Sequence, residues 1–327
     1  MLIKILTAVI TVAAGIAAAF VLYWVLNQFS EHLPGSWGRR IQPYLFILPA
    51  LAAIVVFTVY PAILTVINSF KDNFSRNWIG LANYRALFGS STFVRGTLFN
   101  TLLWILIVPA ACVIMGLAVA VLADRLGPRG EKTTKTVIFL PMAVSLVGAA
   151  TVWRFIYASE PKGSTQIGLL NAIGSIFHKG PVAWLDTSTF HLNSLLLMVI
   201  LLWVQVGFSM VLLSAAVKSV PADTIEAARM DGASERQIFA RVVVPQIRGT
   251  IITVFITVLI TVMKIFDVVY VTTGGAFNTD VLGNQFWTQI STYFNYGAAS
   301  AIVVILMIAI IPVMWYQVKH FQSEEAT

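Results

Sequence analysis

The stretch Lys218–Arg248, KSVPADTIEAARMDGASERQIFARVVVPQIR, is the most informative part of the sequence. Pro221 suits the first turn of a helix, and Gly232 permits the positive φ that a sharp turn between two helices requires. Ser234-Glu-Arg-Gln237 has the spacing of a capping box and begins a second helix. Pro245 marks a break before the apolar block that follows. The stretch therefore predicts two short helices joined by a hinge.

Long apolar blocks surround this stretch and dominate the chain. Of 327 residues, 58% are hydrophobic and only 11% are charged. These values exclude a disordered chain, a nucleic-acid-binding tail and an ordinary soluble enzyme. Blocks of about 20 apolar residues cross a bilayer as helices, and we predict an all-α integral membrane protein with about seven of them. The predicted spans are 3–26, 43–68, 97–123, 136–157, 194–217, 249–271 and 298–317.

The first apolar block has an alternative interpretation as a signal peptide. Its apolar run is longer than the usual h-region of such a peptide, and only Lys4 precedes that run. Basic residues follow the block, at Arg39 and Arg40, which favours a retained helix. We therefore predict residues 1–42 as an N-terminal transmembrane helix with a cytoplasmic linker, and 43–327 as the main helical domain.

The distribution of Lys and Arg indicates which loops face the cytoplasm. If the loop 218–248 is inside, inside segments hold 12 basic residues and outside segments hold 7. Cytoplasmic loops carry such an excess. The net charge of +7 therefore reflects membrane orientation and not a nucleic-acid partner. We predict an N-terminus outside the cell and a cytoplasmic C-terminus.

Residues inside the loop 218–248 also match a known motif. Glu226-Ala227-Ala228 is followed after three residues by Gly232, and after nine more by Val242-x-Val244-Pro245. This resembles the EAA-x3-G-x9-I-x-L-P signature of importer-type ABC transporter permeases, with Val in place of Ile and of Leu. Segments that look like the carbohydrate branch of that family are 60–70, 83–88, 100–104 and 266–275, and 274–287 is similar to α-glucoside-type permeases.

The resemblance implies a six-helix type I permease core in the bacterial inner membrane, preceded here by one extra helix. The loop would then hold a coupling helix that docks on a nucleotide-binding subunit. The residues expected to make that contact are Glu226, Ala227, Ala228, Asp231, Gly232 and Phe239. No G-x4-G-K-[ST] phosphate cradle occurs in this chain, so ATP and Mg²⁺ belong to the partner and this chain is not an enzyme.

Further partners also follow from the resemblance. We expect a second permease subunit, two ATP-binding subunits, an extracytoplasmic sugar-binding protein and membrane lipid. The extra first helix resembles the larger member of heterodimeric sugar permeases, which favours a heterodimer.

Polar residues inside the sixth predicted span indicate a transport path. Lys264 and Asp267 are three residues apart, so we predict that they share one helical face. Charges at this depth face a cavity or a partner; a salt bridge between the two that fixes packing is the alternative. Thr257, Thr261 and Lys264 recur at i, i+4 and i+7. Resemblance to maltose-type permeases implies that this stripe lines the sugar site.

The fifth predicted span offers Trp203, Gln205 and Phe208 for the same path. Sugar sites place aromatic faces against C–H groups, and amide or hydroxyl groups against sugar hydroxyls. A packed core tryptophan and an interhelical amide hydrogen bond are the alternative.

The sequence thus favours the permease subunit of an ATP-driven importer for a sugar, such as an oligosaccharide or an α-glucoside. An ion-coupled secondary transporter that uses Lys264 and Asp267 as a relay is the alternative. A membrane-embedded enzyme would need a clustered nucleophile or metal set near the membrane surface, and the sequence holds none.

Overall fold

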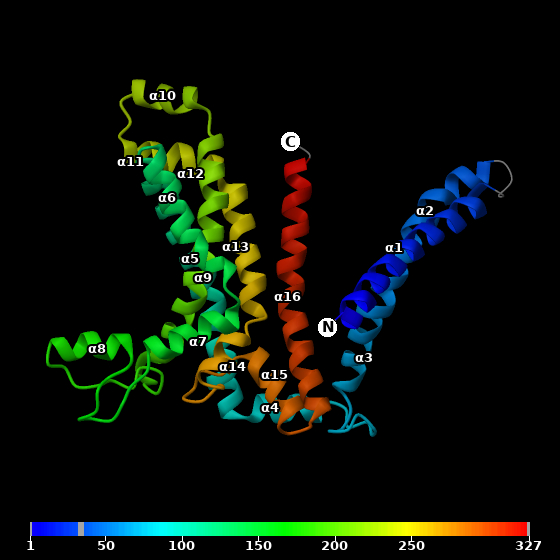
Figure 1. Cartoon of the computed structure of the whole chain (residues 1–327), viewed down its shortest axis with the longest axis horizontal. Coiled ribbons are helices and arrows are strands. Elements are labelled where there is room, and N and C mark those ends of the chain that lie inside the picture. Colours follow the sequence, from blue (N-terminus) through cyan, green and yellow to red (C-terminus); the bar gives the residue numbers. More distant parts are fainter. Residues whose placement is uncertain (1, 32–35, 326–327) are drawn as a thin grey trace. The chain divides into compact units, whose positions relative to one another are not determined.

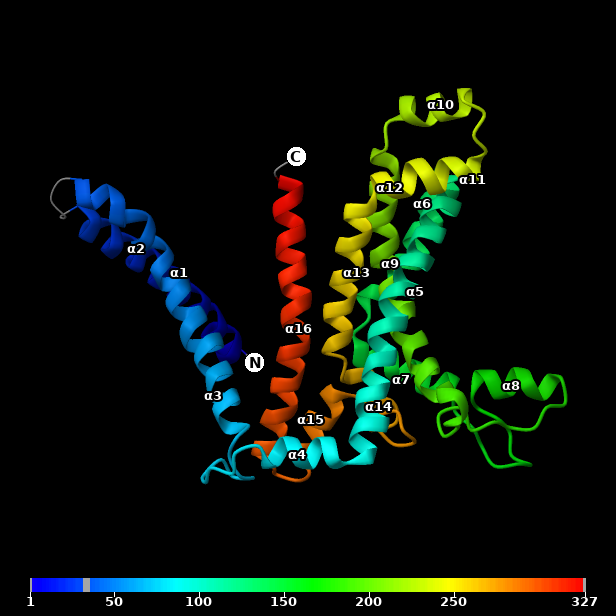
Figure 2. The same cartoon turned by 180° about the vertical axis from the view of Figure 1, so that it is seen from behind.

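The computed structural model describes residues 2–31 and 36–325, and these residues form helices joined by loops (Figures 1 and 2). Within these two ranges the β pairing amounts to one isolated bridge, between Lys71 and Trp78. The predicted all-α class is confirmed. Residues 32–35 of the predicted linker lie outside the described residues.

The chain divides into two compact units, Met1–Ile67 and Asn68–Thr327. In the first unit α1 packs along α2, and the rings of Tyr23 and Phe46 lie 5.3 Å apart. A π-helical turn joins α2 to α3, next to Pro61, which lacks the N–H of a regular helical bond. The elements are α1 (Leu2–Glu31), α2 (Ser36–Ile54), η1 (Val55–Val59) and α3 (Tyr60–Asn68), so helix α2 begins before the predicted start of the second span at 43.

The second unit is built on long helices that carry short helices at both ends. Figure 1 shows α10 to α12 at the end of the bundle where α16 finishes, and α4, α8, α14 and α15 at the other end. The long helices are α5 (Phe99–Asp124), α9 (Leu192–Ser219), α13 (Arg248–Met263) and α16 (Tyr296–Glu325). The shorter elements are α4 (Ala82–Gly89), η2 (Thr92–Leu98), α6 (Pro128–Phe139), η3 (Leu140–Ala143), α7 (Leu146–Ile156), α8 (Leu169–Ile176), η4 (Thr189–His191), α10 (Ala222–Met230), α11 (Glu235–Ile238), η5 (Phe239–Val243), α12 (Val244–Gln246), α14 (Asp267–Thr272) and α15 (Leu282–Ser291).

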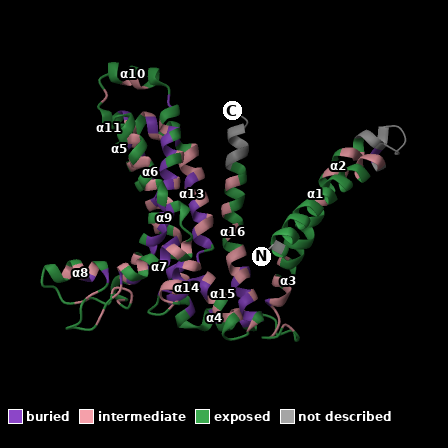
Figure 3. Cartoon of the chain, viewed as in Figure 1, coloured by how far each residue is buried: buried purple, intermediate pink, exposed green. Residues whose placement is uncertain are grey.

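The core of this unit lies between α5, α9 and α13, where the buried residues of Figure 3 concentrate. Trp104 and Val258 are fully buried there. Small residues let the backbones approach: a Cβ on Gly207 of α9 would lie 2.5 Å from the carbonyl oxygen of Ile138 on α6. Membrane helices associate through such close packing because lipid is as apolar as their side chains.

Two of the seven predicted spans are broken. Within the described residues, five helices are long and apolar enough to cross a membrane, or up to seven spans if each of two bent helix pairs counts as one. The predicted fourth span, 136–157, bends by 102° between η3 and α7. Pro141 interrupts the hydrogen bonding there, and Ser145 caps α7 by accepting the N–H of Gly148 at 3.1 Å.

The predicted sixth span, 249–271, is also not one helix. Helix α13 ends at Met263, and α14 begins at Asp267 after a short unwound segment. A Cβ on Gly283 of α15 would lie 2.5 Å from the carbonyl oxygen of Ile265 in that segment. The unwound backbone is therefore packed against protein, the condition under which non-helical backbone is tolerated at membrane depth.

Candidate functional site

The hinge predicted between two short helices is present. Helices α10 and α11 are joined at Gly232, which has φ +79°, a conformation that side chains disfavour. The N–H of Ser234 donates to Oε1 of Gln237 at 2.8 Å and forms the predicted capping box at the start of α11. The predicted break after Pro245 lies at Ile247, where the helix axis turns by 69° into α13.

An ion pair and a buried cluster hold this hinge. Arg229 of α10 donates to Glu235 of α11 at 2.8 Å. Beneath them, Val220, Ile238 and Val243 are buried together. Phe239 is half-buried against this cluster. The structure therefore places Phe239 under the hinge, apart from the outward surface where the other predicted contact residues lie.

The outward surface consists mostly of small and acidic residues. Glu226, Ala227, Asp231 and Gly232 are exposed, and Ala228 is half-buried. A shallow hollow begins at the hinge and is lined by Ala228, Asp231, Gly232, Ala233, Gln237, Arg241 and Val242. Small side chains around a charged rim let another protein approach the backbone closely. We call the residues 226–232 with this hollow the hinge surface.

An ionic cluster fixes the base of the hinge to the bundle. Nζ of Lys218, at the end of α9, lies 3.1 Å from Asp124 of α5 and 2.5 Å from Glu131 of α6. Lys135 reaches the same Glu131 carboxylate at 2.5 Å. The sequence analysis counted Lys135 and Lys218 for orientation but predicted no ion pair among these charges. Glu131 and Lys135 are one turn apart on α6, so their pair had a local signal, whereas the partners of Lys218 come from other helices.

The structure places Thr257 and Thr261 of the predicted polar stripe on α13 and Lys264 at the C-terminal end of that helix. Thr257 and Thr261 are half-buried one turn apart, and their hydroxyls donate to the carbonyls of Thr253 at 2.8 Å and Thr257 at 3.1 Å. By helical geometry they lie on the side of α13 opposite Phe255 and Leu259. The stripe thus faces away from α16, which packs on that other side.

The prediction that Lys264 and Asp267 share a helical face is wrong. Lys264 ends α13 and is exposed, whereas Asp267 begins α14 and is half-buried. The unwound residues between them remove the spacing of a helix turn. The ion pairs found within 4.0 Å in the described part of the chain join other side chains, so the alternative of a salt bridge between these two is wrong as well.

The aromatic and amide groups of α9 point to different sides. Two residues of helix separate Trp203 from Gln205 by about 200°. Trp203 lines an apolar groove together with Trp153, and the two ring centroids lie 6.0 Å apart. Gln205 and Phe208 are half-buried on another face. The structure therefore separates Trp203 from Gln205 and Phe208.

A buried polar network near the start of α15 was not predicted. Oδ1 of Asp280 accepts hydrogen bonds from Nδ2 of Asn284 at 2.7 Å and from the N–H of Val281 at 2.9 Å. Nδ2 of Asn100 donates to the carbonyl of Asp280 at 2.9 Å. Burial raises the pKa of Asp280 to about 6, against the lowering effect of the hydrogen bonds that its carboxylate accepts from Asn284 and Val281. Asp280 and Asn284, two of the polar residues in the stretch 274–287, were the available signal.

Comparison with known proteins decides the family. The family model described as "Binding-protein-dependent transport system inner membrane component" matches residues 112–319. The chain belongs to this family. Its hinge surface lies between α9 and α13, inside the matched range.

Two named permeases are similar to this chain over most of its length. The α-glucoside transport system permease protein AglF of Rhizobium meliloti is 38% identical over 335 residues, 98% of this chain and 98% of AglF. The osmoprotective compounds uptake permease protein GgtC of Synechocystis sp. is 43% identical, over 86% of this chain and 99% of GgtC. Because AglF leaves only 2% of this chain unmatched, the match extends into the first helix. The resemblance to the α-glucoside branch is confirmed.

The fold is shared with a crystallised importer. A chain of a bacterial alginate ABC transporter, in complex with an alginate-bound periplasmic protein, superposes with a TM-score of 0.73 at 20% identity. The superposition covers 86% of this chain and 96% of the alginate transporter chain. This chain therefore shares the overall helical fold of the alginate transporter chain.

Proposed function

We propose that this chain is the membrane-spanning permease subunit of an ATP-driven importer for an α-glucoside or a related oligosaccharide. The observation that carries the proposal is the hinge surface. Its helix α10 is exposed, the Arg229–Glu235 pair joins α10 to α11, and the Lys218 cluster ties the end of α9 to α5 and α6. Such an element transmits motion from a docked ATPase to α9 and α13, the helices on either side of it.

The partners follow from this surface. Two ATP-binding subunits would supply ATP and Mg²⁺, one of them docking on Glu226, Ala227, Ala228, Asp231 and Gly232, so that this chain itself has no catalytic role. An extracytoplasmic sugar-binding protein would deliver the substrate. We propose that a second, different permease chain completes the path, and that the loop 218–248 and the C-terminus are cytoplasmic, with the N-terminus outside.

The substrate path would run along the side of α13 that carries Thr257 and Thr261. Thr257, Thr261 and Lys264 offer hydroxyl and ammonium groups, and Gln205 and Phe208 of α9 offer an amide and an aromatic face. Hydroxyl-rich ligands need such donors and acceptors with an apolar surface for their C–H groups. Trp203, which lines a separate groove, would support the position of α9. Asp267 would stabilise the start of α14.

A second candidate substrate class has its own support. GgtC, an osmoprotective compounds uptake permease, has a higher identity to this chain than AglF has. An importer for osmoprotective compounds would use the same coupling and the same path. Competition between labelled α-glucoside and osmoprotective solutes for uptake separates the two classes. The alternative of an ion-coupled secondary transporter is not favoured, because Lys264 and Asp267 lie on different helices and form no ion pair with each other.

The coupling role is tested with Glu226→Ala and Gly232→Pro in the assembled transporter. Glu226 is exposed, so its loss leaves the fold intact but removes a charge-assisted contact to the ATPase. Proline at 232 cannot adopt φ +79° and lacks the N–H that Gly232 donates to the carbonyl of Arg229 at 3.0 Å. We expect both variants to lose substrate-stimulated ATPase activity.

The control is Glu160→Ala, which removes the same charge from the loop before α8. Normal stimulation in Glu226→Ala and Gly232→Pro, with the ATPase still co-purifying, would remove the coupling role. Loss of stimulation in Glu160→Ala as well as in Glu226→Ala would point to a general effect of charge.

A further inference from the structure

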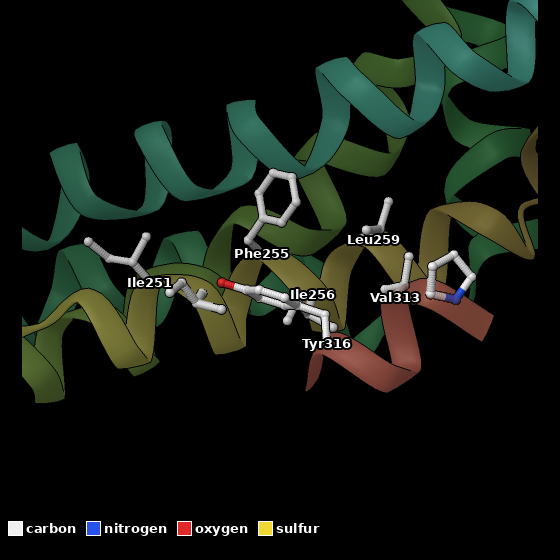
Figure 4. A pocket seen from close by; sticks show the side chains of 8 residues that line it. Ile251, Phe255, Ile256, Leu259, Val313 and Tyr316 are labelled. Atoms are coloured by element: carbon white, nitrogen blue, oxygen red, sulfur yellow. The ribbon is translucent and has the colours of Figure 1, made fainter. Parts of the chain in front are cut away.

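An apolar groove lies between α13 and α16, within the second unit. It has a volume of about 480 Å³, and its lining includes Ile252, Phe255 and Leu259 of α13 and Val313 and Tyr316 of α16. Figure 4 shows the side chain of Tyr316 reaching from α16 toward α13. Every group that lines the groove is apolar except the Tyr316 hydroxyl, which suits a hydrocarbon occupant.

Both walls of the groove end in a cation on the side of the hinge surface. On α13, Arg248, Ile252, Phe255 and Leu259 recur at i, i+4, i+7 and i+11, so they form one stripe. On α16, Pro312, Tyr316 and Lys319 recur at i, i+4 and i+7. The two helices run in opposite directions (Figure 1), which brings Arg248 and Lys319 to the same end.

The level of these cations matches a membrane interface. Lys319 is exposed, and its Nζ lies 5.5 Å from the ring of Trp315, a residue type enriched at headgroup level. From Arg248 to Leu259 the helix rises about 16 Å. This is about half of a 30 Å hydrocarbon core, so the stripe spans one leaflet.

We propose that this groove binds an anionic phospholipid of the leaflet on the hinge side. Its acyl chain would lie between Phe255, Leu259 and Val313, and its phosphate between Arg248 and Lys319. A helix of the second permease chain would also fill an apolar groove. The paired cations at one end favour the lipid, because the phosphate of an anionic phospholipid lies at the headgroup level that both cations reach. The proposal needs only the membrane, and does not depend on the transported substrate or on the coupling role.

The test uses the assembled transporter in nanodiscs of phosphatidylcholine with added phosphatidylglycerol. Native mass spectrometry counts the phosphatidylglycerol retained by wild type, by Arg248→Gln/Lys319→Gln and by the control Arg129→Gln/Lys132→Gln. The control removes two exposed cations of α6, away from the groove. We expect about thirtyfold weaker retention in the groove variant alone, at about 1 kcal/mol per cation. Equal retention in both variants would overturn the proposal.

A second measurement identifies the occupant directly. Benzoylphenylalanine at position 255 replaces one aromatic ring with a photoreactive one inside the groove. An adduct with phosphatidylglycerol that diminishes in the Arg248→Gln/Lys319→Gln background supports the proposal. An adduct with another subunit, or a lipid adduct that the two substitutions leave unchanged, contradicts it.

Discussion

Gly116 of α5 lies so close to Ser209 of α9 that a Cβ on Gly116 would be 2.7 Å from the Cβ of Ser209. The same Cβ would lie 3.0 Å from the backbone nitrogen of Met210. No side chain fits at this contact without moving the helices apart. Since α9 leads directly into the hinge surface, the spacing of α5 and α9 also determines where α10 sits.

We predict that Gly116→Ala destabilises the protein by about 1–3 kcal/mol, the usual cost of an overpacked core. The measurement is the melting temperature of the purified transporter. Gly89→Ala is the matched control, because a Cβ on Gly89 meets nothing within 4 Å. Equal melting temperatures for the two variants would show that α5 and α9 separate without cost.

A second prediction concerns the pH dependence of stability at Asp280. Burial raises the pKa of this carboxyl from 3.8 to about 6. Between these values the folded protein binds more protons than the unfolded chain, so the free energy of unfolding falls as the pH rises through this window. The loss is about 3 kcal/mol at most, at about 1.4 kcal/mol for each pH unit.

Asp280→Asn removes this titration, so we expect the variant to gain stability relative to wild type as the pH rises from 3.8 to about 6. Melting curves of both proteins across that range measure the difference. Parallel pH profiles for wild type and variant would contradict a buried carboxyl at this position.

The proposed orientation predicts which faces accept a membrane-impermeant thiol reagent. Cys112, the single cysteine, is buried in α5, so Cys112→Ala provides the background. Ala222 on α10 and Ser188 before η4 are both exposed and become cysteine in turn. We expect Ala222→Cys to react only from the cytoplasm and Ser188→Cys only from outside. The reverse labelling pattern would show that the protein has the opposite orientation in the membrane.

The proposed path predicts that Thr261→Val and Lys264→Met slow uptake in assembled transporters. Each hydroxyl lost to a sugar costs about 1 kcal/mol, and a charged donor costs more. Because a binding protein delivers the substrate, the maximal rate falls more than KM changes. Thr151→Val is a matched control, since its hydroxyl makes the same bond to a carbonyl one turn earlier, at 2.8 Å on α7. Uptake at the wild-type rate by the path variants would assign these side chains to packing.

Local patterns predicted several parts of the fold correctly. The capping box at Ser234, the hinge at Gly232 and the bend after Pro245 depend on residues within a few positions of one another, and the structure contains all three. The breaks inside the fourth and sixth spans were missed, although Pro141 was a visible signal for the first. A hydropathy window averages over such breaks, because the flanking helices are equally apolar.

The sequence by itself determined the membrane class, the helical composition and the hinge between α10 and α11. These depend on apolar length and on the conformational preferences of single residues, which act within one helix turn or one span. Tertiary structure alone decided that Trp203 lines a groove together with Trp153 and that Lys264 ends its helix before Asp267. It also assembled the Asp280 network, where Thr97 Oγ1 lies 3.4 Å from a carboxylate 183 residues away, and the groove between α13 and α16. Contacts between residues so far apart in the chain depend on how the helices pack, and no local pattern carries that information.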